Sequence, residues 1–235
     1  MPAFAEKFRV IAPDLPGSGF SEPARDLDYR LREIAGRLLK FLDVLGVGEC
    51  DLVGSSHGGA VAMRAASLRP ERVNKLVLVS PVNPFSALGR KRARLLSSEF
   101  IAPLFNRWAP RLKFTHAWVL RRLYGDAAKI APGTLEGYSA PYEKAGSFAH
   151  NLKILESWVD DLEDLKLSLP RIAQIPVLLI WGTLDRAVNP ASGYELKQQF
   201  QNSRLVMFEG VGHLPYEESP EDFNRTVGEF LEANS

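Results

Sequence analysis

The feature that most constrains this chain is an alternation of short apolar runs, rich in β-forming residues, with longer runs of helical spacing. Residues 29–45 carry apolar side chains at helical spacing and end at Gly46, which predicts a helix. The runs that predict strands lie at residues 8–12, 47–53, 73–80, 177–182 and 204–209. Buried strands separated by helices imply an α/β fold, with a mostly parallel sheet that is covered by helices on both faces.

The alternation stops between Pro81 and Pro170. This segment has helical tendency and is rich in aromatic residues, and an insertion after a sheet strand tends to lie over the carboxyl edge of the sheet as a cap. We therefore predict a core at residues 1–82, a helical cap at 83–170 and the rest of the core at 171–235. Most of the cap aromatics are expected to pack the cap onto the core, and one or two to line a pocket; they are Phe100, Phe105, Trp108, Phe114, Trp118, Tyr124, Tyr138, Tyr142, Phe148 and Trp158.

Composition and charge exclude several classes of partner. The 235 residues are 46% hydrophobic, which is ample for a core, and the formal net charge is +1. The one basic cluster, at residues 90–94, is too short to follow a phosphate backbone and is interpreted as a solvated helix face, so no nucleic acid is expected. No apolar stretch approaches the length of a membrane span and no signal-peptide pattern is present, so we expect a cytoplasmic protein without a membrane partner.

Cysteine usage bears on disulfides and metals. The single cysteine, Cys50, excludes an internal disulfide and a cysteine-based metal site. We expect neither a metal nor an organic cofactor. The oligomeric state is left open.

The stretch Gly54-Ser55-Ser56-His57-Gly58-Gly59 lies between a predicted strand and a run of high helix propensity. A G-x-S-x-G sequence at a strand-to-helix turn permits a strained conformation that pushes the serine hydroxyl above the sheet. The N-terminus of the new helix directs free N–H groups toward that oxygen. The pattern therefore indicates that Ser56 is a nucleophile, although the motif alone is equally compatible with a small-residue turn before a helix.

A serine nucleophile needs a base that titrates near neutral pH, and histidine is the side chain that does so unperturbed. His57 adjoins Ser56 and is expected to point away, while packing or surface roles are favoured for His116 and His150 in the cap. His213 lies in a glycine-flanked loop after the last predicted strand, where parallel sheets place functional residues. Asp185 occupies the equivalent loop after the preceding strand, so it is the candidate acid that orients the base.

Together these segments resemble the α/β-hydrolase superfamily, in the group that includes carboxylesterases and carbon–carbon bond hydrolases. The chain order Ser, Asp, His matches the order in that fold. The resemblance covers nearly the whole chain through four motifs: the Asp14–Gly19 loop, the Gly54–Gly59 elbow, Trp181-Gly182 with Asp185, and Gly210–His213 with Glu217 and Pro220.

The resemblance implies a role for each site residue. Ser56 corresponds to the nucleophile, His213 to the base and Asp185 to the residue that orients it, while the backbone N–H of His57 corresponds to one oxyanion-hole donor. Haloalkane dehalogenases and epoxide hydrolases would be expected to have aspartate in place of Ser56. The serine therefore indicates acyl transfer.

The chain departs from the family pattern at its start. Family members ordinarily begin with three more strands, and the loop after the third supplies the second oxyanion donor. The difference amounts to about 40 residues, and loss of one oxyanion donor costs about 10²–10³ in kcat. We therefore hypothesise a truncated or mis-started chain of reduced activity, with an exposed sheet edge or a re-paired strand at residues 8–12. Sequencing the DNA upstream of Met1 tests this, and the absence of in-frame coding sequence for those strands would refute it.

The sequence predicts a serine hydrolase that cleaves an ester of a small organic substrate through an acyl-enzyme. One alternative is carbon–carbon bond hydrolysis, in which cap arginines such as Arg121 and Arg122 would hold a substrate carboxylate, although surface solvation is favoured for both. A second alternative is a non-catalytic hydrolase-like protein that uses its cap to bind a ligand or partner. The substrate and its binding residues remain unassigned.

Overall fold

The structure is a computed structural model, and it describes residues 2–22, 26–86, 113–143 and 149–233. The basic cluster at 90–94 and the aromatic residues Phe100, Phe105, Trp108 and Phe148 lie outside the described part. In chain order the elements are α1 (Pro2–Ala5), α2 (Leu31–Val44), β1 (Cys50–Ser55), α3 (His57–Leu68), η1 (Pro70–Arg72), β2 (Val73–Val79), α6 (Lys113–Leu123), η3 (Ala127–Lys129), α7 (Thr134–Ser139), η4 (Ala140–Glu143), α8 (Ala149–Ser168), η5 (Leu169–Ile172), β3 (Val177–Gly182), α9 (Ala191–Lys197), β4 (Ser203–Phe208), α10 (Pro215–Glu218) and α11 (Pro220–Glu232).

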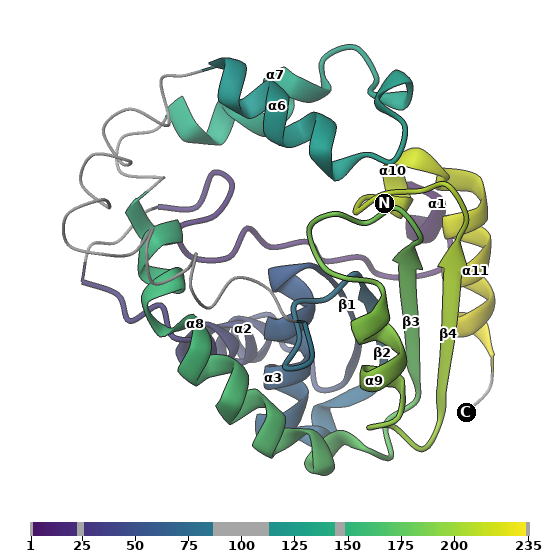
Figure 1. Ribbon diagram of the computed structural model, residues 1–235. Coiled ribbons are helices and arrows are strands. Elements are labelled where there is room, and N and C mark those ends of the chain that lie inside the picture. Colours follow the sequence, from purple (N-terminus) through teal and green to yellow (C-terminus); the bar gives the residue numbers. More distant parts are fainter. Residues whose placement is uncertain (1, 23–25, 87–112, 144–148, 234–235) are drawn as a thin grey trace.

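The described strands form a parallel four-stranded sheet in the order β1-β2-β3-β4. Because all four strands run in the same direction, their carboxyl ends meet at one edge of the sheet, where the loops that follow them also lie (Figure 1). The α/β fold class predicted from the sequence is confirmed. The predicted strands at 73–80, 177–182 and 204–209 agree with β2, β3 and β4 to within one residue at each end.

Helices cover both faces of the sheet, as expected for parallel strands. Alternate side chains of β2 point to opposite faces: Leu76 and Leu78 belong to one buried cluster, and Val77 and Val79 to another. The first cluster includes α2, α3 and the C-terminal half of α8, and the second packs against α11 (Figure 1).

The first strand expected from the sequence does not form. Residues 8–12 run without a strand assignment, and Val10 is 37% exposed. The apolar run was therefore misread, because a strand also needs a neighbour to which its N–H and C=O groups can bond. The strand β1, which follows α2 in the chain, lies at one edge of the described sheet, and Val53 on it is 55% exposed.

The segment expected to form a cap is helical where it is described. Helices α6 and α7 lie above the carboxyl edge of the sheet, whereas α8 runs down along α2 and α3 (Figure 1). Leu162 and Leu165 of α8 are buried in the main core. The domain boundaries at residues 82/83 and 170/171 stay predictions. No helix in the described ranges has the length and apolar content needed to cross a membrane.

Lys75 of β2 ties the sheet to the end of the last helix. The side chain is 8% exposed, and its Nζ donates hydrogen bonds to the carbonyl oxygens of Phe230, Leu231 and Ala233 at 3.2, 2.8 and 2.6 Å. These carbonyls lie at the C-terminus of α11, where helix carbonyls lack internal partners and a positive charge is favoured.

Replacing Lys75 by Met should lower the free energy of unfolding by about 2 kcal/mol, because the stem stays buried while the charged donor to three carbonyls is lost. Urea denaturation followed by circular dichroism measures this change. The exposed Lys40 of α2 supplies the control, and Lys40→Met should stay within about 0.5 kcal/mol of the parent. Equal effects of the two substitutions would contradict the role given to Lys75.

Candidate active site

Ser56 occupies a strained turn between β1 and α3. Its φ is 51° and its ψ is −121°, a backbone conformation that non-glycine residues seldom adopt. The small neighbours are needed, because a Cβ on Gly54 would lie 2.4 Å from the carbonyl oxygen of Gly58, and one on Gly59 would lie 2.5 Å from Cβ of Pro81. These close approaches explain why glycines flank the serine at this turn.

The neighbouring strand holds this turn in place. The N–H of Ser56 donates to the carbonyl oxygen of Val79 at 2.9 Å, and the N–H of Val82 donates to the carbonyl oxygen of Ser56 at 3.0 Å. One backbone bond to the last residue of β2 and one to the segment that follows β2 thus hold the strained conformation in place, as such conformations require.

Asp185 and His213 lie in loops after β3 and β4, and the structure brings them together. Nδ1 of His213 is 2.8 Å from Oδ2 of Asp185, and the two residues are only 4% and 7% exposed. The other carboxylate oxygen, Oδ1, accepts the N–H groups of Ala187 at 2.7 Å and Val188 at 3.0 Å. Because one oxygen is anchored by the backbone, the other is aimed at the imidazole, which leaves Nε2 of His213 as the ring nitrogen available for proton transfer.

The loop that carries His213 also reaches the Ser56 turn. Tyr216 follows three residues later; burial raises its pKa, and hydrogen bonding with the side chains of Ser55 and Tyr138 offsets part of this rise. Tyr216 therefore lies beside Ser55, the residue that precedes the candidate nucleophile. None of the hydrogen bonds of the described residues joins Ser56 directly to His213.

The other histidines have different surroundings. The ring of His57 stacks on Trp158 of α8 with centroids 6.2 Å apart, and desolvation lowers the pKa of His57 to about 4. His116 of α6 lies 3.2 Å from the hydroxyl of Ser139 and 5.5 Å from the ring of Tyr142, which is a packing environment within the cap segment. His150 is the second residue of α8, and its side chain lies outside the described part.

The backbone N–H of His57 is at the first position of α3, where helix N–H groups have no partner within the helix. It is thus available to a negatively charged oxygen near Ser56. Among the described residues, no group of three histidine, cysteine or acidic side chains could hold a metal ion.

Glu218 was not identified from the sequence, yet it joins the His213 loop to the cap segment. The residue is 5% exposed, and its carboxylate accepts the N–H groups of Gly212 at 2.7 Å, Gly125 at 2.9 Å and Asp126 at 3.1 Å. In addition, the N–H of His213 donates to the carbonyl oxygen of Leu123 at 2.6 Å. The end of α6 and the loop of the candidate base are therefore one connected structure.

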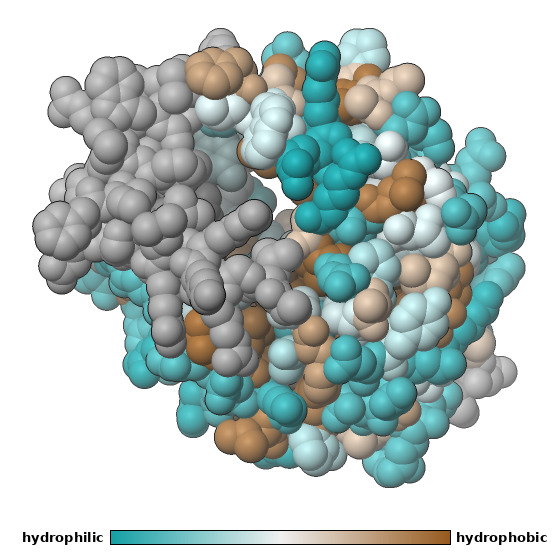
Figure 2. All heavy atoms as spheres, viewed as in Figure 1, coloured by the Kyte–Doolittle hydropathy of each residue, from teal (hydrophilic) through white to brown (hydrophobic). Residues whose placement is uncertain are grey.

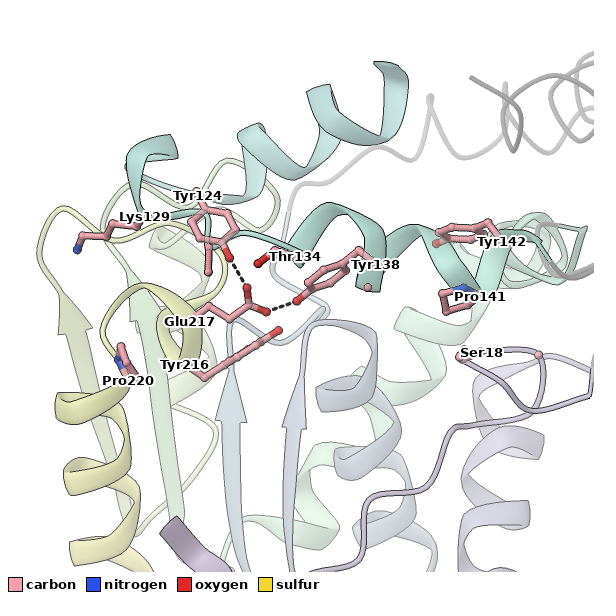
Figure 3. A pocket seen from close by; sticks show the side chains of 14 residues that line it. Ser18, Tyr124, Lys129, Thr134, Tyr138, Pro141, Tyr142, Tyr216, Glu217 and Pro220 are labelled. Carbon is pink, nitrogen blue, oxygen red and sulfur yellow. Dashed lines mark hydrogen bonds between the residues drawn. The ribbon is translucent and has the colours of Figure 1, made fainter. Parts of the chain in front are cut away.

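A pocket of about 680 Å³ lies between the α6–α7 region and the core, and Figure 2 shows a hollow between these two parts of the surface. One or two aromatic residues of the expected cap were predicted to line a pocket, and three of them do so: Tyr124, Tyr138 and Tyr142. The residues that line it are Gly17, Ser18, Gly19, Tyr124, Lys129, Ala131, Thr134, Gly137, Tyr138, Pro141, Tyr142, Tyr216, Glu217 and Pro220 (Figure 3). Ser56, Asp185 and His213 do not line this pocket directly, but Tyr216 connects it to the Ser56 turn.

The match to a family model decides the family: the model of the alpha/beta hydrolase fold matches residues 1–220. The chain belongs to this family. An uncharacterized hydrolase of Bacillus subtilis, YugF, is 30% identical over 234 residues, which span 98% of this chain and 83% of that protein. The 2-hydroxy-6-oxo-6-phenylhexa-2,4-dienoate hydrolase of Burkholderia cepacia is 30% identical over 237 residues, which span 98% of this chain and 79% of that protein.

Solved structures agree on the α/β-hydrolase fold. The meta-cleavage product hydrolase of Pseudomonas fluorescens superposes with a TM-score of 0.82 at 23% identity, covering 99% of this chain and 83% of that chain. A likeness at this identity bears on the fold, and it agrees with the sheet and helix arrangement described above.

Replacing Glu218 by Ala should lower the free energy of unfolding by about 3 kcal/mol, because three N–H groups lose a charged acceptor. Glu218→Gln should cost less, since the amide oxygen can still accept. Urea denaturation measures both, and Glu229→Ala on the exposed side of α11 serves as the control, with an expected change within about 0.5 kcal/mol. A Glu218→Ala protein as stable as the control would contradict the role of this carboxylate.

Proposed function

We propose that this protein is a serine hydrolase that cleaves a carboxylic ester of a small organic substrate through an acyl-enzyme at Ser56. The observation that carries the proposal is the buried 2.8 Å contact between His213 and Asp185, at the sheet edge where the strained Ser56 turn also lies. A histidine whose Nδ1 is bonded to an aspartate is held in the tautomer that accepts a proton at Nε2.

The proposed reaction has two halves. The Ser56 hydroxyl attacks the ester carbonyl while Nε2 of His213 takes its proton, and the protonated imidazole then gives that proton to the departing alcohol. In the second half, water attacks the acyl-enzyme, again with His213 as base, and the acid is released. The N–H of His57 stabilises the negative oxygen of each tetrahedral intermediate.

A second candidate is hydrolysis of a carbon–carbon bond, which is favoured by relatives that are named dienoate and semialdehyde hydrolases. The arginines considered for holding a substrate carboxylate do not support it. Arg121 and Arg122 are both exposed, and the Arg122 guanidinium stacks over the ring of Trp118 at 5.0 Å. Ester hydrolysis is therefore the proposal that we retain.

The nucleophile can be tested by labelling with a fluorophosphonate, which reacts covalently with activated serines. The parent protein should be labelled and should hydrolyse 4-nitrophenyl acetate, whereas Ser56→Ala should lose the label and at least 10³-fold in kcat. Ser203→Ala changes a serine at the opposite end of the sheet and should retain both. Absence of Ser56-dependent labelling in the folded protein would refute the proposal and favour a non-catalytic binding protein.

Replacing Asp185 by Asn should lower kcat for the same ester by about 10⁴, with a smaller change in KM. The asparagine oxygen can still accept the N–H groups of Ala187 and Val188, but the amide nitrogen would then face Nδ1 of His213 and favour the tautomer with a proton on Nε2. Steady-state kinetics measures the change, with Asp222→Asn on α11 as the matched control. A loss below tenfold would show that Asp185 does not orient the base.

A further inference from the structure

The pocket beside the Ser56 turn has a distinctive acceptor. Glu217 lines it from α10, and both of its carboxylate oxygens accept a phenolic hydroxyl: Oε2 that of Tyr124 and Oε1 that of Tyr138 (Figure 3). Both tyrosines come from the segment above the sheet, whereas Glu217 comes from α10, the short helix that follows His213. The carboxylate is therefore fixed in orientation by two groups from the other side of the pocket.

These tyrosines remain donors at neutral pH. Burial and the hydrogen bond to Glu217 raise the pKa of Tyr124, and burial together with the neighbouring Tyr216 and Glu217 raises that of Tyr138. A carboxylate oxygen can accept about two hydrogen bonds, and each oxygen of Glu217 uses one for a tyrosine. Capacity for a further donor thus remains on a carboxylate that lines the pocket.

Charge in the described lining is restricted to Glu217 and Lys129. Nζ of Lys129 donates to the backbone carbonyl of Glu218 at 3.1 Å. The Lys129 side chain points away from Tyr124, Tyr138 and Tyr216 (Figure 3). The part of the pocket next to Tyr216, and hence next to the Ser56 turn, consequently carries a negative charge without a facing cation among the described lining residues. The labelled lining residues around Glu217 are Tyr124, Tyr138, Tyr216 and Thr134, which are uncharged, whereas Pro141 lies farther along the pocket beside Tyr142 (Figure 3).

We propose that this pocket is a substrate subsite that accepts a hydrogen-bond-donating group without negative charge, and that Glu217 makes it reject carboxylates. The inference deepens the proposed function and rests on it. A donor such as a hydroxyl or amide N–H can bond to Glu217 in a partly buried place, where such a bond is strong. A substrate carboxylate would instead face a fixed like charge, which is a repulsive element that specificity can use.

Three 4-nitrophenyl esters with six-carbon acyl chains test the proposal: the hexanoate, the 6-hydroxyhexanoate and the monoester of hexanedioate. They differ only in the far end of the acyl chain, which is methyl, hydroxyl or carboxylate. The parent protein should show a kcat/KM for the carboxylate ester at least tenfold below that for the hydroxyl ester. In Glu217→Gln this ratio should fall to about twofold, because the substitution removes the charge and keeps an acceptor oxygen.

The control is Glu221→Gln, which removes the same charge from an exposed residue of α11 outside the pocket lining. This variant should keep the parent ratio, so the ratio separates a local effect of Glu217 from a change in net charge. Equal rates for the carboxylate and hydroxyl esters in the parent protein would overturn the proposal. A Glu217→Gln ratio that matches the parent and Glu221→Gln would also overturn it.

A binding measurement separates this inference from the proposed reaction. Isothermal titration of the Ser56→Ala protein with 4-phenylbutan-1-ol and with 4-phenylbutyrate needs no catalysis. The alcohol should bind at least tenfold more tightly, and the difference should vanish in Ser56→Ala/Glu217→Gln. If Ser56-dependent labelling fails but this preference is found, the proposed function is wrong and the ligand preference stands; if labelling succeeds and the preference is missing, the reverse holds.

Discussion

A close contact between three backbone segments organises the candidate site. A Cβ on Gly182, at the end of β3, would lie 2.1 Å from the carbonyl oxygen of Gly212, and one on Gly212 would lie 2.4 Å from the backbone nitrogen of Gly125. The Asp185 loop, the His213 loop and the segment after α6 can thus stack only because these positions lack side chains. Glu218 then bonds the second and third segments together. The Asp185–His213 hydrogen bond depends on this stacking.

Much of the architecture was predictable because a fully apolar strand can be buried in few arrangements. An apolar run such as residues 177–182 is fully buried, and it needs helices on both faces, which the neighbouring sequence supplies. The misread run at residues 8–12 shows the limit of this argument. Its composition suits a strand, but strand formation depends on a bonding partner that composition does not reveal.

The candidate site likewise contains residues that the sequence predicts and residues that only the structure identifies. Ser56, Asp185 and His213 could be proposed because each follows a strand, and the ends of parallel strands share an edge. Glu218 could not, and the motif that contains Glu217 gave that residue no role, because two acidic residues after a proline are also what the first turn of any helix favours. Their partners Tyr124 and Gly125 are 93 residues earlier in the chain, and only the folded structure shows that these residues form hydrogen bonds with the two glutamates. Long-range pairing of this kind leaves no local pattern.

The bond from the N–H of His213 to the carbonyl of Leu123 has a consequence for how such proteins can diverge. The end of α6 therefore supports the loop that carries the candidate base His213, in addition to forming part of the segment above the sheet. An exchange of residues 113–143 with those of a relative would alter ligand selection at α7, yet it would have to reproduce the backbone path from Leu123 to Asp126 unchanged. We therefore expect substitutions in this segment to disturb the imidazole least when they lie beyond that turn.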